Sequence, residues 1–477
     1  MALNKKEWFM IDSKPIYLTH GNFGGSFKCA FESKMHWQKQ LESNPHHFIN
    51  YQLYDEIVNS RNALSKFLGC ESEDLIYFPN PTTALNTVIK NIDLKHNDEV
   101  LTSNHEYGAL DKTWDYYSTK KGFIYKKVCI DIPYDSKEKF IYSFLKNINK
   151  NTKVIFLSHI TSSTGLIFPI KEICEIAKER NILTIIDGAH APCHIDLNIL
   201  DIDPDVYVGA CHKWMCTPKG ASYLYVTKSF QKFVEPLVIS WGWQDQLFTK
   251  SEFVNWHQWQ GTNDFSSYLT VPIALDFIEK NNWNLVRDKC KNLILKTKEI
   301  LNDSSSVCFP TSNNNEHIGQ MLSFTVNQNS SLVQDIKKDP TKILYYQAQI
   351  FEKSNIHIPI IFWNNQVFIR VSIQAYNSSN DVDSMFKMLD LFNASEMIMM
   401  GLVLFSSFWI FLFNYRTDNK DKYADNKWLI LLDLLINMGM SVTGYLLITV
   451  VFTNVPQLAA YESYRYPIGY LFGLTSN

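Results

Sequence analysis

Short apolar runs alternate with amphipathic stretches through the first 265 residues of the chain. Each run has the length and apolar character of a buried strand and is followed by small or polar residues. These runs lie at 75–78, 154–157, 183–186 and 206–209. The stretch at 54–67 repeats its apolar residues at helical spacing. Strands that alternate with helices predict an α/β fold.

The pattern changes after residue 265. The runs 319–326 and 367–373 read as strands, and the second is followed by a turn and a helical repeat, which indicates an α+β unit. We therefore expect four parts. They are an N-terminal segment (1–60) that packs on the small domain beside the active site, a large domain (61–265), a small α+β domain (266–392) and a hydrophobic tail (393–477).

The tail contains two long apolar runs. Residues 397–415 carry no charge, and residues 429–452 are interrupted only by Asp433 and Asn437. Because about 20 apolar residues can cross a bilayer, the pair predicts a transmembrane helical hairpin. An apolar docking element and a fusion of unrelated coding sequence are the alternatives. The basic residues of the loop between the runs would place that loop in the cytosol, which conflicts with a cytosolic catalytic domain.

Composition narrows the remaining choices. A net charge of −3 gives no electrostatic reason to expect nucleic acid as a partner. Nine cysteines, scattered and odd in number, favour a reducing compartment over a disulfide scaffold. The first residues carry charge but no apolar segment of the secretory type. We therefore expect a cytoplasmic catalytic domain, with a membrane anchor in residues 397–452.

Candidate chemistry lies in the stretch from Asp187 to Lys213. Asp187 ends one apolar run, and Lys213 comes shortly after the next. Two neighbouring buried strands would bring this carboxylate and this amine to the same edge of a sheet. A lysine in such a site can form a Schiff base with a carbonyl cofactor, and a carboxylate suits a protonated pyridine nitrogen. The pair predicts pyridoxal 5′-phosphate (PLP).

Two other interpretations of this stretch compete with a PLP site. An aspartate at a strand end is usually a turn residue or a helix cap, and a lone lysine is usually solvated. A cluster of histidines and cysteines could instead suggest zinc, but its spacing matches no common zinc pattern, so we expect no metal. The cluster consists of His190, Cys193, His194, Cys211, His212 and Cys216.

The motifs taken together resemble those of a known family. DGAHA at 187–191, CHKW at 211–214 and PKGASYLYV at 218–226 look like the class V aminotransferase family, and within it the isopenicillin N epimerase-like branch. The resemblance covers roughly residues 15 to 392. It implies the PLP-dependent transferase fold, with a mixed, mostly parallel sheet of the seven-stranded type in the large domain and a smaller α+β domain. Residues 220–226 would be the antiparallel strand.

The resemblance also assigns the cofactor site. Lys213 and Asp187 would be the catalytic residues, and His190 would bond the oxygen of the cofactor ring. The phosphate would be held by Thr82 and Thr83 at a helix start, where free backbone N–H groups favour anions, and by His212. An aromatic ring would cover the cofactor, with His105 favoured and Tyr107 second. Pro81 replaces the alanine that the family usually has before the two threonines.

Substrate contacts and assembly follow from the same resemblance. Arg370 would bind the substrate carboxylate bidentately, with Asn22 and Ser162 nearby. The family forms homodimers with shared active sites, and Thr262 would reach the phosphate of the neighbouring subunit. Relatives commonly have an arginine where this chain has Asn263. That difference leaves the identity of the amino-acid-type substrate open.

Several reactions fit these parts. Epimerisation at Cα is the first reading, and β-elimination by a C–S lyase acting on a cysteine conjugate and transamination are the alternatives. A persulfide-forming desulfurase is not expected, because no cysteine follows Cys308. A degenerate PLP fold that serves as a scaffold at a membrane is the non-enzyme alternative, and the intact Asp187, Lys213 and Arg370 argue against it.

Overall fold

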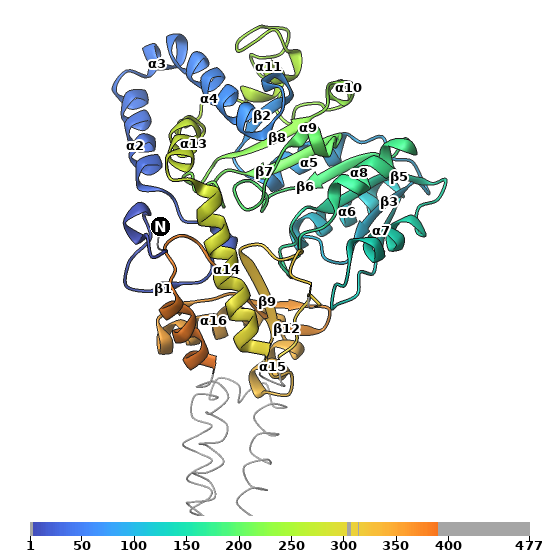
Figure 1. The fold of residues 1–477 in the computed structure, drawn as a ribbon. Coiled ribbons are helices and arrows are strands. Elements are labelled where there is room, and N and C mark those ends of the chain that lie inside the picture. The colour runs from blue at the N-terminus through green and yellow to red at the C-terminus, as the bar shows by residue number, and fades with distance from the viewer. Residues whose placement is uncertain (1–2, 303–306, 313, 390–477) are drawn as a thin grey trace, which may run out of the picture. The chain divides into compact units, whose positions relative to one another are not determined.

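The computed structural model describes residues 3–302, 307–312 and 314–389 (Figure 1). All but the last few of these residues belong to one compact unit, Met1–Asp383. The two apolar runs of the predicted membrane hairpin, 397–415 and 429–452, lie outside the described residues. Of the described helices, none combines the length and apolar character needed to cross a bilayer.

The described residues form a central sheet of seven strands. Its strands, in spatial order, are β2 (Leu75–Phe78), β8 (Ser222–Val226), β7 (Val206–Ala210), β6 (Leu183–Asp187), β5 (Thr152–Ser158), β3 (Glu99–Ser103) and β4 (Ile124–Val128). β8 runs antiparallel to both of its neighbours, and the other pairs are parallel. The predicted α/β fold and the antiparallel strand at 220–226 are therefore confirmed.

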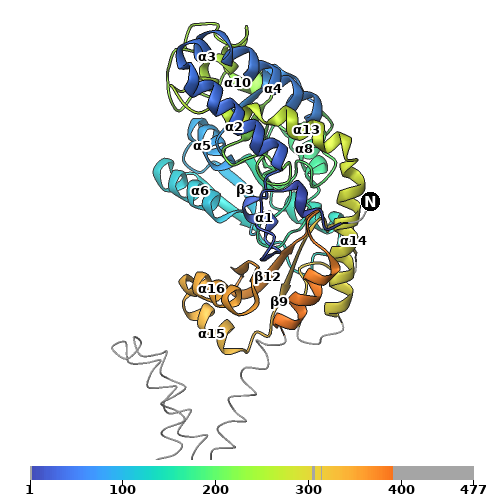
Figure 2. The same ribbon diagram turned by 90° about the vertical axis from the view of Figure 1, so that its left-hand side faces the viewer.

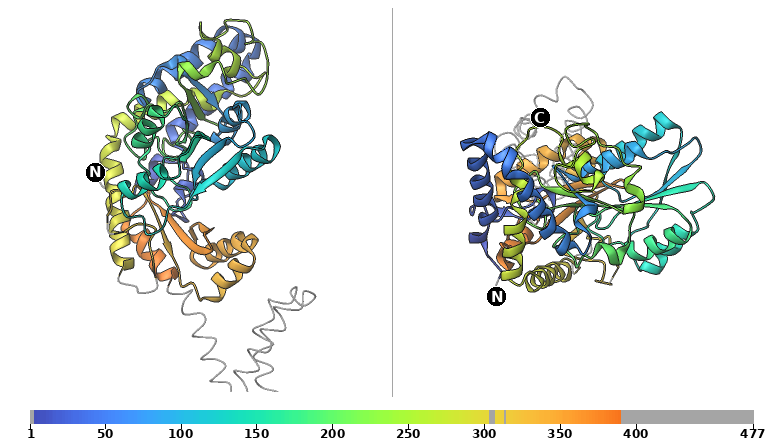
Figure 3. Two further views of the ribbon diagram at one scale, coloured as in Figure 1. Left: turned by 90° about the vertical axis from the view of Figure 1, so that its right-hand side faces the viewer. Right: turned by 90° about the horizontal axis from the view of Figure 1, so that it is seen from above.

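The four strands seen in the sequence are buried because they are covered on both faces. Near-continuous apolar runs are what a parallel sheet between two helical layers requires. Helices lie on both sides of the sheet (Figure 3). Those in contact with its strands include α5 (Pro81–Asn91), α6 (Gly108–Lys121), α8 (Ile170–Glu179) and α11 (Glu252–Gln258). The same part of the chain also forms α7 (Lys137–Leu145), α9 (Ile199–Ile202), α10 (Lys228–Gln231) and α12 (Ser266–Leu269).

The N-terminal residues contact both parts of the unit. β1 (Ile16–Tyr17) pairs in parallel with β10 (Ile356–His357), which comes more than 300 residues later. Four helices follow β1, and α2 and α4 pack against α13 (Val271–Lys280). They are α1 (His20–Phe23), α2 (Lys28–Ser43), α3 (Pro45–Tyr51) and α4 (Leu53–Leu68). Short 3-10 helices lie at Lys6–Trp8, Ser72–Asp74 and Pro340–Lys342.

A smaller antiparallel sheet carries the C-terminal part of the unit. It has the order β11 (Ile360–Trp363), β12 (Gln366–Ser372) and β9 (Met321–Thr325). Figure 2 shows α15 (Ser331–Lys338) and α16 (Ile343–Ser354) on one side of this sheet and the long α14 (Trp283–Asn302) on the other. A further helix begins at residue 379. The nine cysteines of the chain all lie among the described residues and none forms a disulfide.

Candidate active site

Asp187 and Lys213 lie at the same edge of the central sheet. Asp187 is the last residue of β6, and Lys213 comes three residues after the end of β7. β6 and β7 are parallel neighbours, with Asp187 opposite Val208. In open α/β sheets, ligands bind outside the carboxyl ends of the strands. The edge that carries both residues is therefore where a cofactor site is expected.

The carboxylate of Asp187 is buried but incompletely satisfied. Its Oδ1 accepts the backbone N–H of Ala189 at 2.9 Å, which leaves Oδ2 for a further donor. Burial raises the pKa of this carboxyl group, and the Ala189 N–H and the charge of Lys213 oppose the rise. A buried acceptor of this kind suits the N–H of a protonated pyridine ring.

Lys213 is half-buried and its amine contacts a histidine. The Nζ atom lies 3.1 Å from His190 Nε2. Burial lowers the pKa of Lys213 to about 8, helped by Arg370 and opposed by Asp187. Burial also lowers the pKa of His190 well below its ordinary value, and Lys213 and Arg370 add to the effect. At pH 7 about one lysine in ten is thus an uncharged nucleophile, far more than for a lysine with the ordinary pKa.

The N-terminal segment closes over this lysine. Gly24 has φ +72°, and a Cβ built on it would lie 2.1 Å from the backbone oxygen of His212. His20 Nε2 lies 3.2 Å from the backbone oxygen of Lys213, and its Nδ1 lies 2.9 Å from the hydroxyl of Tyr376. Gly24 is therefore required by the close approach of its backbone to that of His212 and Lys213.

Arg370 brings the predicted substrate residues together. Its Nη1 donates to the backbone oxygen of Ser162 and lies 3.3 Å from the Ser162 hydroxyl, and its Nη2 donates to Asn22 Oδ1. The side chain is buried, and its Nε has no partner among the described residues. Burial lowers the pKa of Arg370 to about 10, and Tyr107 opposes this. Neutral partners on a buried guanidinium leave its charge available to a carboxylate.

The two predicted aromatic candidates have different surroundings. His105 is fully buried, its Nδ1 lies 2.9 Å from Thr164 Oγ1, and its Nε2 donates to the oxygen of Ile130 at 2.9 Å. Its ring packs on Trp363 with centroids 4.3 Å apart. Tyr107 is 46% exposed and interacts electrostatically with Arg370. Of the two candidates, Tyr107 is thus the exposed one and the one that interacts with Arg370, whereas His105 is enclosed by other side chains.

Three of the predicted phosphate residues lie at the start of α5 and in the loop after β7. Thr82 and Thr83 open α5, whose N-cap Asn80 accepts both the backbone N–H (2.8 Å) and the hydroxyl (3.1 Å) of Thr83. His212 donates from Nδ1 to the oxygen of Ala221 at 2.8 Å, so in the neutral ring Nε2 carries the lone pair. The start of α5 carries no acidic residue. Thr262 is exposed in the loop after α11.

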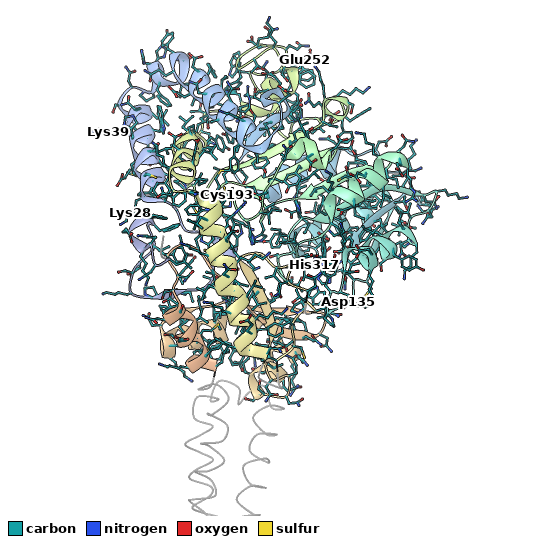
Figure 4. All side chains as sticks on the ribbon, in the orientation of Figure 1. Lys28, Lys39, Asp135, Cys193, Glu252 and His317 are labelled. Carbon is teal, nitrogen blue, oxygen red and sulfur yellow. The ribbon has the colours of Figure 1, made fainter. Side chains whose placement is uncertain are left out.

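The long helix α14 contacts the loop that follows β6. Arg287 on α14 donates to Asp196 at 2.5 Å, and the buried Cys193 lies close to this helix (Figure 4).

No group of three or more histidine, cysteine, aspartate or glutamate side chains able to hold a metal occurs in the described part of the chain. Trp214 and His20 belong to the site but were missed by sequence reasoning; the tryptophan of the CHKW motif was the available signal.

The match to a family model covers most of the unit that holds this site. The model of the aminotransferase class-V family matches residues 27–385. The chain belongs to the class V aminotransferases. It is therefore a PLP-dependent enzyme, and the buried acceptor of Asp187, the amine of Lys213 and the acid-free start of α5 fit PLP.

Individual relatives are more distant. The isopenicillin N epimerase of Amycolatopsis lactamdurans is 25% identical over 80% of this chain and 96% of its own length. The hercynylcysteine sulfoxide lyase of Schizosaccharomyces pombe is 23% identical over 64% and 79%. The cysteine desulfurase of Thermococcus onnurineus matches with a TM-score of 0.70 and 18% identity over 83% of this chain and 99% of its own. A mutant of C-DES with glycine linked to its PLP cofactor gives a TM-score of 0.66 and 18% identity over 81% and 98%.

Proposed function

We propose that the chain acts on the Cα–H bond of an α-amino acid, with epimerisation as the reaction. The observation that carries the proposal is the convergence of Asp187, Lys213 and Arg370 from β6, the loop after β7 and β12. Bound PLP supplies an electron sink for the bond that is broken. The charges of the three residues match the pyridine nitrogen, the reacting carbon and the carboxylate of such a substrate.

Each side chain has a role that follows from its surroundings. Asp187 Oδ2 would accept the pyridine N–H, and His190 would bond the ring oxygen. Thr82, Thr83 and His212 would hold the phosphate, and Thr262 would reach the phosphate site of a second subunit. Arg370 would exchange its bonds to Asn22 and Ser162 for a bidentate pair with the substrate carboxylate. Lys213 Nζ would take up and return the proton of Cα.

Epimerisation needs a second proton carrier besides Lys213. Tyr107 is the candidate, because its phenol is exposed beside Arg370 and would lie close to a bound carboxylate. We also prefer Tyr107 to His105 as the ring that covers the cofactor, since both nitrogens of His105 are already bonded and Trp363 packs on its ring. The relatives matched over nearly their full length include two isopenicillin N epimerases, which supports this choice.

C–S lysis is the second candidate. β-Elimination requires a base at Cα but no second proton carrier there, so Lys213 alone would suffice. The relatives include a hercynylcysteine sulfoxide lyase and several cysteine desulfhydrases. Transamination would require the proton to be moved to a carbon of the cofactor, and no residue beyond Lys213 distinguishes it.

The first experiment asks whether PLP is bound to Lys213. The full-length chain with PLP should show a visible-edge absorbance band, and borohydride should fix the cofactor to the peptide that contains Lys213. Lys213→Ala should lose the covalent link, whereas Lys228→Ala, on the far side of β8, should keep it. A folded wild-type chain without covalent PLP would sink the proposal.

A second experiment separates the reactions. Amino acids are incubated with the enzyme in D₂O and followed by NMR and chiral chromatography. Epimerisation predicts α-deuterium in both enantiomers, and Tyr107→Phe should slow inversion by about 100-fold or more while α-exchange persists. Release of pyruvate from cysteine conjugates, with no inversion, would instead establish the lyase.

A further inference from the structure

Trp214 is fully buried immediately after Lys213, between two histidine rings. Its ring centroid lies 4.7 Å from that of His20 and 4.1 Å from that of His194. Its indole N–H points at a third histidine and donates to His190 Nδ1 at 3.3 Å. The opposite nitrogen of that ring, Nε2, lies 3.1 Å from Lys213 Nζ. Trp214, His190 and Lys213 thus form a continuous chain of polar contacts.

Only one set of proton positions satisfies this chain. An indole nitrogen is always a donor, so His190 Nδ1 must carry a lone pair. A neutral imidazole with a lone pair on Nδ1 has its hydrogen on Nε2. The Nε2–H then points at Lys213 Nζ, which must accept the hydrogen bond. A lysine ammonium group has three donors and no acceptor, so the contact is satisfied only by the free amine.

We propose that Trp214 is a positioning residue that fixes the Nε2–H tautomer of His190 and so favours the free amine of Lys213 over the ammonium form. The free amine is the form that attacks a carbonyl carbon. The inference rests on the proposed role of Lys213 as the cofactor lysine and extends it to a residue outside the contact set of the cofactor. The same Nε2–H would be a donor for the ring oxygen of bound PLP.

The two rings beside Trp214 are themselves held by backbone groups. His20 Nδ1 accepts the Gly25 N–H at 3.2 Å, so its Nε2–H donates to the oxygen of Lys213. His194 Nε2 accepts the N–H of Gln320 at 2.6 Å, and its Nδ1–H donates to the oxygen of His190 at 3.1 Å. Both tautomers are therefore set without a second titratable group. The indole lies between two rings of fixed orientation, which keeps its N–H aimed at His190.

The charges around the amine agree with this assignment. Arg370 faces both Lys213 and His190 and disfavours a second positive charge on either. Asp187 acts in the opposite direction and favours the ammonium form. His194 and His20, the other titratable groups near His190, have pKa values lowered to about 3 by burial and stay neutral. The hydrogen-bond chain therefore works with Arg370 and against Asp187.

The test measures the tautomer directly in the cofactor-free, full-length chain. The protein is labelled with ¹⁵N-histidine, and His190 is assigned with the His190→Gln variant. At pH 7 to 8, long-range ¹H–¹⁵N spectra should show a bare Nδ1 and a protonated Nε2 for His190. Trp214→Phe, which keeps an aromatic ring but removes the donor, should give a mixture of tautomers. A wild-type His190 with Nδ1–H or an imidazolium would overturn the proposal.

A second readout follows the amine. The rate of reductive methylation of Lys213 is measured by mass spectrometry as a function of pH. Trp214→Phe should shift the midpoint upward by about one pH unit, the loss of roughly one hydrogen bond. Trp114→Phe is the matched control, because the buried Trp114 nitrogen has no partner among the described residues and its loss should leave the midpoint unchanged. An unshifted midpoint in Trp214→Phe would also overturn the proposal.

Neither readout uses PLP, so the role of Trp214 is tested separately from the proposed function. A chain that binds no PLP would refute the function while leaving the tautomer measurable. If Trp214→Phe does not fold, the wild-type tautomer decides by itself.

Discussion

A protonated Lys213 is costly in the folded chain, because it is partly withdrawn from water and faces Arg370. The pKa of this lysine falls from 10.5 to about 8, while the unfolded chain keeps the ordinary value. The unfolded state therefore binds the proton more tightly, and folding is penalised at every pH below about 8. The penalty fades as the pH rises from 8 to 10.5, where the unfolded lysine also loses its proton. Burying the Lys213 amine in the site therefore lowers the free energy of unfolding at neutral pH.

This penalty predicts that Lys213→Met stabilises the cofactor-free protein. At pH 7 the gain in the free energy of unfolding should be about 2 kcal/mol, after the pKa shift is discounted for partial exposure. The gain should shrink steadily above pH 8. Urea unfolding at a series of pH values measures it. A variant that is less stable than the wild type at pH 7 would contradict the prediction.

At the scale of the element, the start of helix α5 gives Thr82 and Thr83 different hydrogen-bond partners. Asn80 already accepts both the N–H and the hydroxyl of Thr83, so this threonine is part of the N-cap. The Thr82 hydroxyl has no such partner among the described residues. The backbone oxygen of Thr82 accepts a hydrogen bond from the Asn86 side chain at 2.9 Å. The sequence treated the two threonines alike, whereas the helix geometry favours Thr82 as the group free to hold a phosphate.

A matched pair of variants tests this division. Thr82→Val should weaken PLP binding about tenfold or more, the cost of one hydrogen bond to a charged group, with little change in melting temperature. Thr83→Val should have the smaller effect on affinity and should lower stability by roughly 0.5–1 kcal/mol, because the hydroxyl bond to Asn80 is lost while the backbone N–H bond remains. Fluorescence titration with PLP and thermal unfolding give the two quantities. Equal losses of affinity would show that both hydroxyls contact the phosphate.

At the scale of the whole molecule, Thr262 is the predicted phosphate contact that would act in a second subunit. It lies exposed after α11, with the neighbouring Gly261 at φ +121° and open space around that glycine. Large apolar side chains are also exposed in the loop before α11, including Trp241 at 77%. Exposed aromatic side chains of this size commonly mark an interface. The homodimer in which each subunit completes the site of the other stays a prediction, and these exposed residues are where it would be tested.

Mixing two inactive variants tests the shared site. Lys213→Ala lacks the amine, and Thr262→Glu would repel the phosphate of the neighbouring subunit. A heterodimer of the two has one site with both native residues, so an equal mixture should recover roughly a quarter of the native PLP sites. Covalent PLP after borohydride treatment counts those sites. No recovery in a mixture shown to contain heterodimers would place Thr262 in its own subunit's site, and a Thr262→Glu variant that binds PLP by itself would show that Thr262 contacts no phosphate.

The sequence determined much of this protein by itself. Buried strands are short apolar runs with clear ends, so β2, β5, β6, β7, β8, β9 and β12 could be recognised, and with them the edge that carries Asp187 and Lys213. Elements without such a signal were missed. β4 is a partly exposed edge strand with two lysines, and β1 and β10 are two residues each and exist only because they pair. Their strand character comes from the partner, not from the local pattern.

Only the tertiary structure decided which of the candidate side chains meet. Arg370 donates to Asn22, which lies 348 positions earlier in the sequence. His105 is enclosed because Trp363 packs on its ring and both of its nitrogens bond to Thr164 and Ile130, which are distant in sequence. Trp214 contacts His190 only because the loops after β6 and β7 fold over the same edge. Periodicity records which residues are buried, since burial repeats with the period of the helix or strand. It carries no record of which buried donor faces which acceptor, and in this protein those pairings set the chemistry of the site.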